Sequence, residues 1–477
     1  MRKKVFMILL GLILILPLLT MNLEEDQVSQ LDNRPLTTLD RKKGEEEEIR
    51  LPIDFSQYSA MFEDYLSDRI GFREEMLSLY GNGFNSLFHV LKHANYEYGV
   101  EDEVHYKFTE HPLDRDFVER FYNYLGVMDR YLDTKGIDFV FAMNPSKNDI
   151  YPETVPDDVH ISYRNMNYLR QLMSNHFVTY VDNIEFFQNL ETEERIFNHQ
   201  YDTGHWTDYG AVLGIENMIA PFREKHPEIG EISLEKLERE ENVEPYLPNS
   251  KIRIDEPVIN YVNPNYQSIY QGDYVNDLHR NIKIHPIHRN LDIRQNPNNP
   301  DAPKLLIFRG SFMNHKDEFY SNAFSEVIGI HNYENIFDLD YYLNLFKPDM
   351  VLFEVAASAF STDYFSRSGF KARYSLPHSF YDSLVEYSSQ PYLEDISIEM
   401  IPGDTLVNFV ATYPENFDTA YFTLEDIVND THPVDNGDGT YTAYTAFYAN
   451  NIQEGTKAYL ELIDDTNKMK IKVPIDL

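Results

Sequence analysis

Residues 304–312 read Lys-Leu-Leu-Ile-Phe-Arg-Gly-Ser-Phe, an apolar run that passes directly into a glycine and a serine. Runs of this kind are typical of strands that are buried on both faces of a parallel sheet. Gly310 permits a sharp turn after the strand. Ser311 then lies at the carboxyl edge of the sheet, where α/β proteins place their sites. A serine in this position is more often only a turn residue, so a functional role for Ser311 depends on the other segments of the sequence.

The same pattern of short apolar runs separated by helical periods recurs on both sides of residues 304–312. Such alternation indicates a mostly parallel sheet covered by helices on both faces, which is a three-layer α/β domain. We assign residues 51–388 to this domain. Further strands are expected at 137–142, 177–181 and 350–355, and helical patterns at 55–80, 113–135, 162–173, 209–222 and 339–346.

Two regions depart from this alternation. Residues 239–303 are rich in Asn and Pro and are interpreted as an irregular insertion. Residues 389–477 contain strand patterns without an intervening helical period, and the sequence Asn-Gly-Asp-Gly at 436–439 is a hairpin-type turn signal. The C-terminal part is therefore predicted to be a small antiparallel β-sandwich that serves as an accessory domain. Its strands are expected near 406–411, 441–448, 459–463 and 469–473.

Composition excludes several classes of function. The chain has 477 residues, a formal net charge of -38 and no cysteine. A strongly acidic surface opposes binding of phosphate backbones, so a nucleic-acid partner is not expected. Without cysteine there is no disulfide, no thiolate nucleophile and no cysteine-ligated metal. Hydroxyl, carboxylate and imidazole chemistry remain, as does binding without catalysis.

The N-terminus indicates where the protein works. Residues 1–4 carry three basic side chains, and residues 5–23 form an uncharged run just long enough to span a bilayer as a helix. We interpret residues 1–23 as a retained signal-anchor helix with an extracytoplasmic body behind it, and residues 24–50 as a polar tether. Pro17 leaves the alternative of a cleaved signal peptide and a secreted protein.

The most informative polar segment is Tyr-Asp-Thr-Gly-His-Trp-Thr at 201–207. Asp202 and His205 are three residues apart and directly precede a helix for which Thr207 is a plausible N-cap. In a tight turn, this spacing brings a carboxylate onto the imidazole and leaves the other ring nitrogen free to act as a base. The alternative interpretation is a helix cap without catalytic function.

A second polar segment, 143–152, follows the strand at 137–142. Its side chains are expected at the same sheet edge, where Asn144 or Asn148 would donate a hydrogen bond to an oxyanion. Lys147 would orient an acyl donor or an acidic sugar. A solvated loop is the alternative. We add Arg309 and Trp206 to the expected substrate-binding or oxyanion residues because they adjoin Ser311 and His205, and assign Glu354 a structural role.

The order of these segments resembles the SGNH-hydrolase-like proteins that O-acetylate extracellular polysaccharide, the alginate acetyltransferases of the AlgJ and AlgX kind, and the related DHHW proteins. The resemblance spans about residues 55–370. It rests on four elements that follow one another in the family's order. These are residues 62–73, Pro145 to Lys147 with Tyr151-Pro152, Asp202 to His205, and the turn at Ser311.

Two departures from the family pattern stand beside this resemblance. The chain has two residues between Asp202 and His205 where family members often have one. It also has Arg309-Gly310 where the family has an aspartate before the serine.

The resemblance implies an SGNH-like fold and an extracytoplasmic O-acyl (acetyl) transferase or esterase. Ser311 would be the nucleophile, His205 the general base and acid, and Asp202 the residue that orients it. The acceptor would be a cell-surface or secreted polysaccharide. A membrane acyltransferase would supply the acyl group, and no cofactor or metal is expected. The principal alternative is a non-catalytic glycan-binding or assembly protein with the same fold; a metal phosphodiesterase is a weaker one.

Overall fold

The computed structural model describes residues 55–93, 95–107, 112–159, 161, 163–264, 266, 291–365, 369–370, 382–431 and 433–477, together with residues 4, 6, 11, 15–22, 28–29 and 34–36. Most of the expected signal-anchor and tether, and residues 267–290 of the expected insertion, lie outside the described residues. Within the described part of the chain, no helix has the length and apolar character that crossing a membrane requires.

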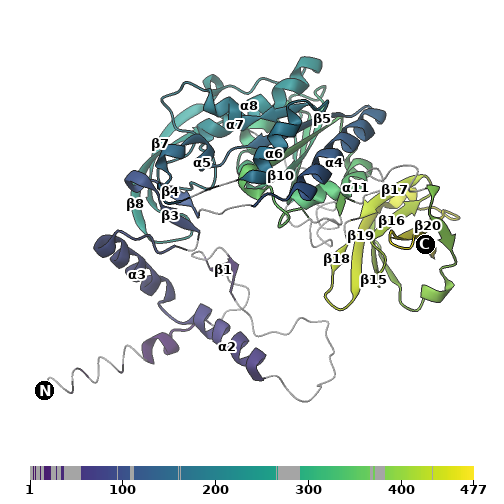
Figure 1. Cartoon of the computed structure of the whole chain (residues 1–477), viewed down its shortest axis with the longest axis horizontal. Helices are drawn as coiled ribbons and strands as arrows, with labels where there is room; N and C mark the ends of the chain where they lie inside the picture. The colour runs from purple at the N-terminus through teal and green to yellow at the C-terminus, as the bar shows by residue number, and fades with distance from the viewer. Residues whose placement is uncertain are drawn as a thin grey trace.

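A mostly parallel sheet forms the centre of the α/β domain and confirms the predicted fold class (Figure 1). Its strands lie in the order β6-β5-β12-β10-β11-β9, and every neighbouring pair is parallel except β11 and β9. The strands are β5 (Asp138–Asn144), β6 (Tyr180–Asp182), β9 (Leu291–Gln295), β10 (Lys304–Arg309), β11 (Glu326–His331) and β12 (Met350–Ala356).

Helices cover both faces of this sheet. On one face, the Phe121 ring of α4 (Arg115–Thr134) lies 5.8 Å from the Phe141 ring of β5. Asn144 points to the other face, because residues three apart in a strand face opposite ways. There it contacts Asn183 of α7 (Asn183–Gln188), which in turn reaches α8 (Asp208–Lys225). The other helices are α5 (Lys147–Ile150), α6 (Arg164–Met173), α10 (Asp317–Tyr320) and α11 (Leu339–Phe346).

The C-terminal part is the predicted β-sandwich. One sheet has the order β13-β21-β20-β16-β17 and the other β14-β15-β19-β18. Phe409 and Phe422 meet between the sheets with ring centroids 6.4 Å apart. The strands are β13 (Val385–Tyr387), β14 (Ser397–Ile401), β15 (Leu406–Pro414), β16 (Thr419–Leu424), β17 (Ile427–Thr431), β18 (Val434–Asp435), β19 (Thr440–Tyr448), β20 (Ala458–Asp464) and β21 (Met469–Ile475).

The predicted turn at 436–439 joins β18 to β19. Gly437 and Gly439 have φ of 74° and 88°, the region in which glycine is favoured. The boundary between residues 388 and 389 stays a prediction. β13, which precedes it, pairs with β21 of the sandwich.

The interpretation of residues 239–303 as irregular is wrong for its described ends. β7 (Glu238–Tyr246) and β8 (Arg253–Val262) form an antiparallel hairpin, and β9 joins the central sheet. β7 is exposed along almost its whole length, so it has no alternation of buried and exposed side chains that would identify a strand.

Before the α/β domain, α2 (Phe55–Arg69) and α3 (Arg73–Phe88) confirm the helical pattern expected at 55–80. The two helices are separated at Phe72, which has a φ of 60°. β3 (Tyr96–Tyr98) and β4 (Val104–Tyr106) connect them to the domain. Figure 1 shows α2 and α3 extending away from the central sheet toward the N-terminus.

Candidate active site

Ser311 lies directly beyond the end of β10, at the first position of a short 3-10 helix that spans residues 311–313. The preceding turn is tightly enclosed. A Cβ atom on Gly310 would lie 1.9 Å from the Tyr333 hydroxyl, so no side chain fits there. The Gly310 N–H donates to Glu354 Oε1 at 2.6 Å. Packing on one side and a hydrogen bond on the other therefore fix the position of Ser311.

The Asp202–His205 turn brings its two side chains to the same place. His205 Nε2 is 2.9 Å from Ser311 Oγ, and His205 Nδ1 is 2.8 Å from Asp202 Oδ1. The turn is closed by the His205 N–H, which donates to the Asp202 carbonyl at 3.1 Å. Thr207 caps α8 by accepting from the Gly210 N–H. The structure thus joins Ser311 to a pair that lies more than 100 residues earlier in the chain.

This arrangement has the connectivity of a nucleophile, a base and an orienting acid. A carboxylate on Nδ1 selects the tautomer whose Nε2 lone pair faces the serine hydroxyl. The His205 and Asp202 side chains are 33% and 38% exposed, so both are open to a substrate. The N–H of Ser311 begins a helix and has no intrahelical acceptor, which leaves it available to an oxyanion.

Trp206 is in the interior and not in the substrate-binding position that we expected. Its side chain is 3% exposed, and its Nε1–H donates to the Phe312 carbonyl at 2.8 Å. The ring also contacts the Phe312 ring edge-on. Trp206 therefore links the segment after His205 to the segment after Ser311, and positions the two halves of the site against each other.

Asn144 is also buried, so the structure contradicts its expected role as an oxyanion donor. Its Nδ2 donates to Glu354 Oε2 at 2.6 Å, and its Oδ1 accepts from Asn183 at 2.7 Å. Asn183 Oδ1 in turn accepts from Asn217 of α8 at 2.8 Å. This buried chain of hydrogen bonds runs from the Gly310 turn to α8, the helix that follows His205.

Glu354 is the central group of that chain and titrates unusually. It is fully buried, and burial raises its pKa to about 7. A carboxyl whose pKa is raised on folding binds more protons in the folded state between its unfolded pKa and 7. Stability from this group is therefore lost as pH rises through that window, by an amount on the order of 3 kcal/mol.

We expect Glu354→Gln to flatten the dependence of unfolding free energy on pH between about pH 5 and pH 8 relative to wild type. Denaturant unfolding followed by the fluorescence of Trp206, the only tryptophan in the chain, measures this in the α/β domain. Glu454→Gln, an exposed change in the sandwich, is the control. Parallel wild-type and Glu354→Gln curves would show that Glu354 does not titrate in this range.

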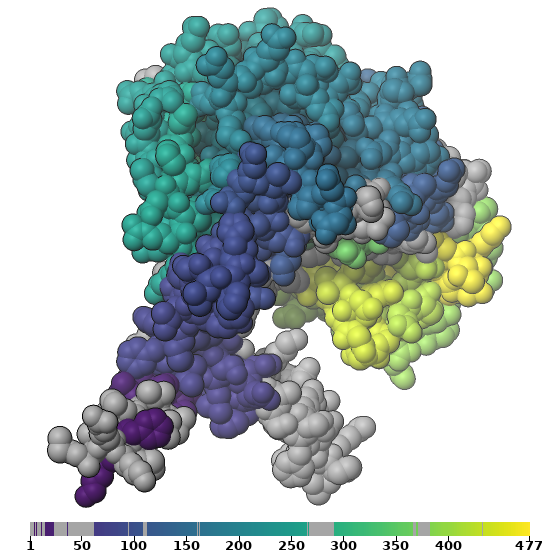
Figure 2. Space-filling model, turned by 60° about the vertical axis from the view of Figure 1, so that its left-hand side comes forward, coloured from purple at the N-terminus to yellow at the C-terminus, as the bar shows by residue number. Residues whose placement is uncertain are grey.

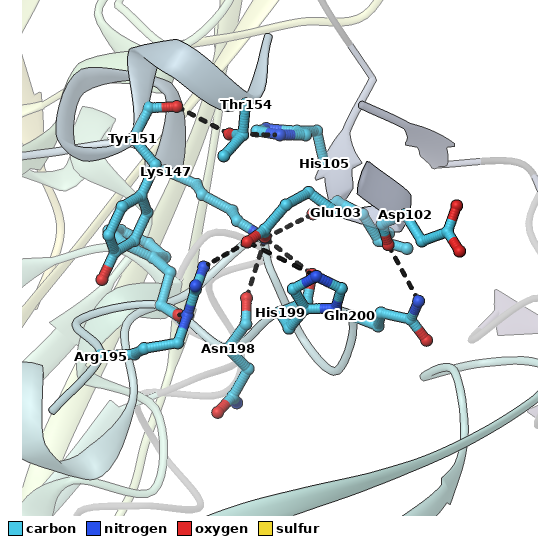
Figure 3. A network of polar contacts seen from close by, with 12 residues as sticks. Asp102, Glu103, His105, Lys147, Tyr151, Thr154, Arg195, Asn198, His199 and Gln200 are labelled. Atoms are coloured by element: carbon cyan, nitrogen blue, oxygen red, sulfur yellow. Dashed lines mark hydrogen bonds and ion pairs between the residues drawn. The ribbon is translucent and has the colours of Figure 1, made fainter. Parts of the chain in front are cut away.

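Lys147 forms a buried ion pair and does not face a substrate (Figure 3). Its side chain is 2% exposed and its Nζ lies 2.5 Å from Glu103 Oε2. The ammonium also donates to the carbonyls of Val104, Asn198 and His199, each at 2.8 Å. Lys147 therefore ties β4 to the loop that leads into Asp202.

Asn148 and Arg309, the remaining two expected site residues, form hydrogen bonds with other side chains of the protein. Asn148 Oδ1 accepts from the buried His105 at 2.6 Å, and burial lowers the pKa of His105 to about 4, which keeps that ring neutral. Arg309 is 7% exposed and donates to Asn314 Oδ1 at 2.7 Å, just after Ser311. Arg309 crosses β11 at Gly329, where a Cβ would lie 3.0 Å from Arg309 Nε.

Sequence analysis missed Glu256, a carboxylate that organises the approach to Asp202. Glu256 lies on β8 and accepts the consecutive N–H groups of His199, Gln200 and Tyr201, the first two at 2.7 and 2.8 Å. Nothing in the local sequence marks it, because its partners lie more than 50 residues earlier. Glu256 and the Lys147–Glu103 pair together fix the 198–201 segment.

A cavity of about 580 Å³ lies away from this site, against the start of β10. Lys304 and Glu326 line one side, and Ile427 and Tyr448 of the sandwich line the other. The sandwich packs nearby on α11, where Asn344 donates to Asn429 Oδ1 at 2.7 Å. Among the described residues, no group of three His, Asp or Glu side chains is placed to hold a metal ion.

Comparison with known proteins agrees with the resemblance in the sequence. Residues 105–246 match the family model of the SGNH hydrolase-like domain of the acetyltransferase AlgX. The matched segment contains Asp202 and His205 and ends before Ser311. The match confirms the resemblance to the SGNH-like acetyltransferases. No protein with a curated description matches the chain.

Solved structures with a similar arrangement are distant in sequence. PatB1 of Bacillus cereus is 18% identical over 60% of this chain and 99% of its own, with a TM-score of 0.42. The O-acetyltransferase domain of Pseudomonas putida AlgJ is 12% identical over 58% and 97%, with a TM-score of 0.40. AlgX of Pseudomonas aeruginosa is 10% identical over 77% and 94%, with a TM-score of 0.37.

Proposed function

We propose that this chain transfers or hydrolyses O-acyl groups, acetyl above all, on a cell-surface or secreted polysaccharide, with Ser311, His205 and Asp202 as its catalytic residues. The match of residues 105–246 to an acetyltransferase domain supports the reaction class. The observation that carries the proposal is the continuous contact from Ser311 Oγ to His205 Nε2 at 2.9 Å and from His205 Nδ1 to Asp202 Oδ1 at 2.8 Å.

In the first half-reaction, Ser311 Oγ attacks the carbonyl carbon of the acyl donor as His205 Nε2 takes the serine proton. The negative charge that forms on the carbonyl oxygen accepts a hydrogen bond from the Ser311 N–H. When the tetrahedral intermediate collapses, the bond to the leaving group breaks and His205 returns the proton to that group. The product is an acyl ester on Ser311, and Asp202 holds the imidazolium in place meanwhile.

In the second half-reaction, a hydroxyl group of the polysaccharide replaces the leaving group. His205 takes the hydroxyl proton, the sugar oxygen attacks the acyl carbon, and the ester bond to Ser311 breaks as the proton returns to Oγ. Water in place of the sugar gives hydrolysis. The exposure of His205 and Asp202 suits a large acceptor, because a polymer then need not be enclosed.

The N-terminal sequence supports an extracytoplasmic location for the reaction. Residues 1–23 anchor the chain, with the basic tip in the cytoplasm and the body outside; a cleaved signal and a secreted body are the alternative. Acetyl-CoA is not available there, so a membrane acyltransferase partner hands over the acyl group. The chain itself needs no cofactor for the proton transfers described above.

Incubation of the purified full chain with 4-nitrophenyl acetate tests the proposal. We expect a burst of nitrophenol approaching one per chain, followed by turnover that an acceptor polysaccharide accelerates if transfer is the reaction. The rival is a glycan-binding protein without catalysis, which the Arg309-Gly310 context and the β-rich sandwich favour. Polysaccharide binding without a burst would support that rival and contradict the enzyme.

A further inference from the structure

Helix α3 attaches to the rest of the protein through its polar face. Ser78 and Asn82 both donate to the Lys251 carbonyl on the segment that leads into β8, at 3.4 and 2.8 Å. Glu74 forms an ion pair with the Lys251 side chain at 3.2 Å. Asn85, one turn after Asn82, accepts from a tyrosine of β3 at 2.9 Å. These residues recur at three- and four-residue steps and therefore share one side of the helix.

The remaining surface of α3, opposite and beside the polar face, is largely apolar and faces outward. An amphipathic helix normally turns its apolar side toward the protein, and α3 does the reverse. Leu79 and Leu87 are 78% and 77% exposed. We call this side the outer face of α3. It consists of Met76, Leu77, Leu79, Tyr80, Leu87 and Phe88, all of them exposed.

Aromatic contacts make the outer face a continuous surface. The half-buried Phe84 lies between Tyr80 and Phe88, with ring centroids 4.6 and 5.2 Å apart. Lys92, which follows the helix, places its ammonium 5.4 Å from the centre of the Phe84 ring. A cation at the rim of an apolar surface is the arrangement that long basic side chains adopt at a membrane interface.

The outer face begins where the apolar N-terminal run ends. The Gly71 N–H donates to the Pro17 carbonyl, and the Asn22 N–H donates to the Arg69 carbonyl, both at 2.9 Å. Arg69 is 2% exposed, so this corner between α2 and α3 is firmly packed. Leu19, in the run itself, is 75% exposed. Figure 2 shows the described N-terminal residues, in purple, and this helical region together at one extremity of the molecule.

We propose that the outer face of α3 lies on the lipid bilayer, at the boundary between headgroups and acyl chains. The inference rests on the extracytoplasmic, membrane-anchored location proposed above. A helix that turns a broad apolar surface outward next to a membrane anchor can bury that surface at the boundary between headgroups and acyl chains. The proposed anchor at 5–23 places α3 next to the membrane surface. The polar side of α3 then connects it to the rest of the protein through β3 and the segment that leads into β8.

Site-directed spin labelling of the full chain in phospholipid vesicles tests this arrangement. Because the chain has no cysteine, Leu79→Cys and Leu87→Cys each provide a unique thiol. Thr466→Cys, in the exposed turn between β20 and β21, is the matched control. We expect labels at 79 and 87 to be more accessible to oxygen than to a water-soluble nickel chelate, and the label at 466 to show the reverse.

Two results overturn the inference. Labels at 79 and 87 that behave like the label at 466 would place the outer face in water. Labels shielded from both reagents and broadened by dipolar coupling between chains would make it a contact between two copies.

Flotation of the unlabelled chain with vesicles, and the nitrophenol burst, separate this inference from the proposed function. Failure to float contradicts both the location and the inference. Flotation and a normal burst with water-exposed labels contradict the inference alone.

Discussion

Replacing Ser311 with alanine should lower ester turnover by about 10⁴-fold or more and remove the nitrophenol burst completely. The hydroxyl 2.9 Å from His205 Nε2 is the atom that would carry the acyl group, and alanine leaves nothing for the imidazole to activate. Because Ser311 is half-buried and is the first residue of a packed 3-10 helix, the smaller side chain should leave the fold intact. Stopped-flow absorbance of nitrophenol release measures both the burst and the steady rate.

The control for this prediction is Ser174→Ala, an exposed serine at the end of α6 whose hydroxyl donates to the Gln171 carbonyl and accepts from the neighbouring Asn175 side chain. It should keep the full burst. In the producing cell, the acetyl content of the polysaccharide should fall with Ser311→Ala and stay unchanged with the control. Undiminished acetylation in the Ser311→Ala strain would show that Ser311 is not the nucleophile.

Lys147→Met should destabilise the α/β domain by about 3–5 kcal/mol. The substitution keeps the apolar stem but removes the Lys147 ammonium from the Glu103 carboxylate, which is 5% exposed. Only Arg195 and, at 3.7 Å, the His199 ring then face that carboxylate. The substitution also removes the ammonium group that donates hydrogen bonds to the carbonyls of Val104, Asn198 and His199. Burial lowers the pKa of Lys147 to about 8, so the lost group is still a cation at pH 7. The midpoint of denaturant unfolding, followed by Trp206 fluorescence, measures the loss.

Two comparisons isolate the buried charge. Lys225→Met removes a 62% exposed lysine that pairs with Asp138, and should cost less than about 1 kcal/mol. Adding Glu103→Leu to Lys147→Met should recover part of the stability, because no buried carboxylate then remains without its lysine partner. Equal losses for the two lysines would contradict the role given to Lys147.

The fold was predictable to the extent that its elements have a local pattern. β5, β10 and β12 are apolar runs, and α4 has apolar side chains every three or four residues. β11 was not predicted, although it is buried along most of its length. Its apolar run is interrupted by Gly329, the position at which the Arg309 side chain crosses the strand. The β7–β8 hairpin was not predicted from the sequence. Backbone hydrogen bonds pair its two strands, and β7 has no alternation of buried and exposed side chains that would identify it.

The candidate site was likewise predictable only where its residues lie in one short segment. Asp202 and His205 lie in one turn and Ser311 ends one strand, so their chemistry was visible in short segments. Asn144 and Lys147 were expected to face outward because they follow a strand. Their partners, Glu354 and Glu103, lie far away in the sequence, and only the folded chain shows that both side chains turn inward.

The β7–β8 hairpin has an evolutionary consequence. One carboxylate on β8, Glu256, fixes the loop before Asp202, whereas β7 is exposed along almost its whole length. A lineage that keeps Glu256 is free to change β7, residue by residue, without disturbing the acid–base pair. We therefore expect the exposed side chains of β7 to tolerate substitution with little effect on the contact between Asp202 and His205.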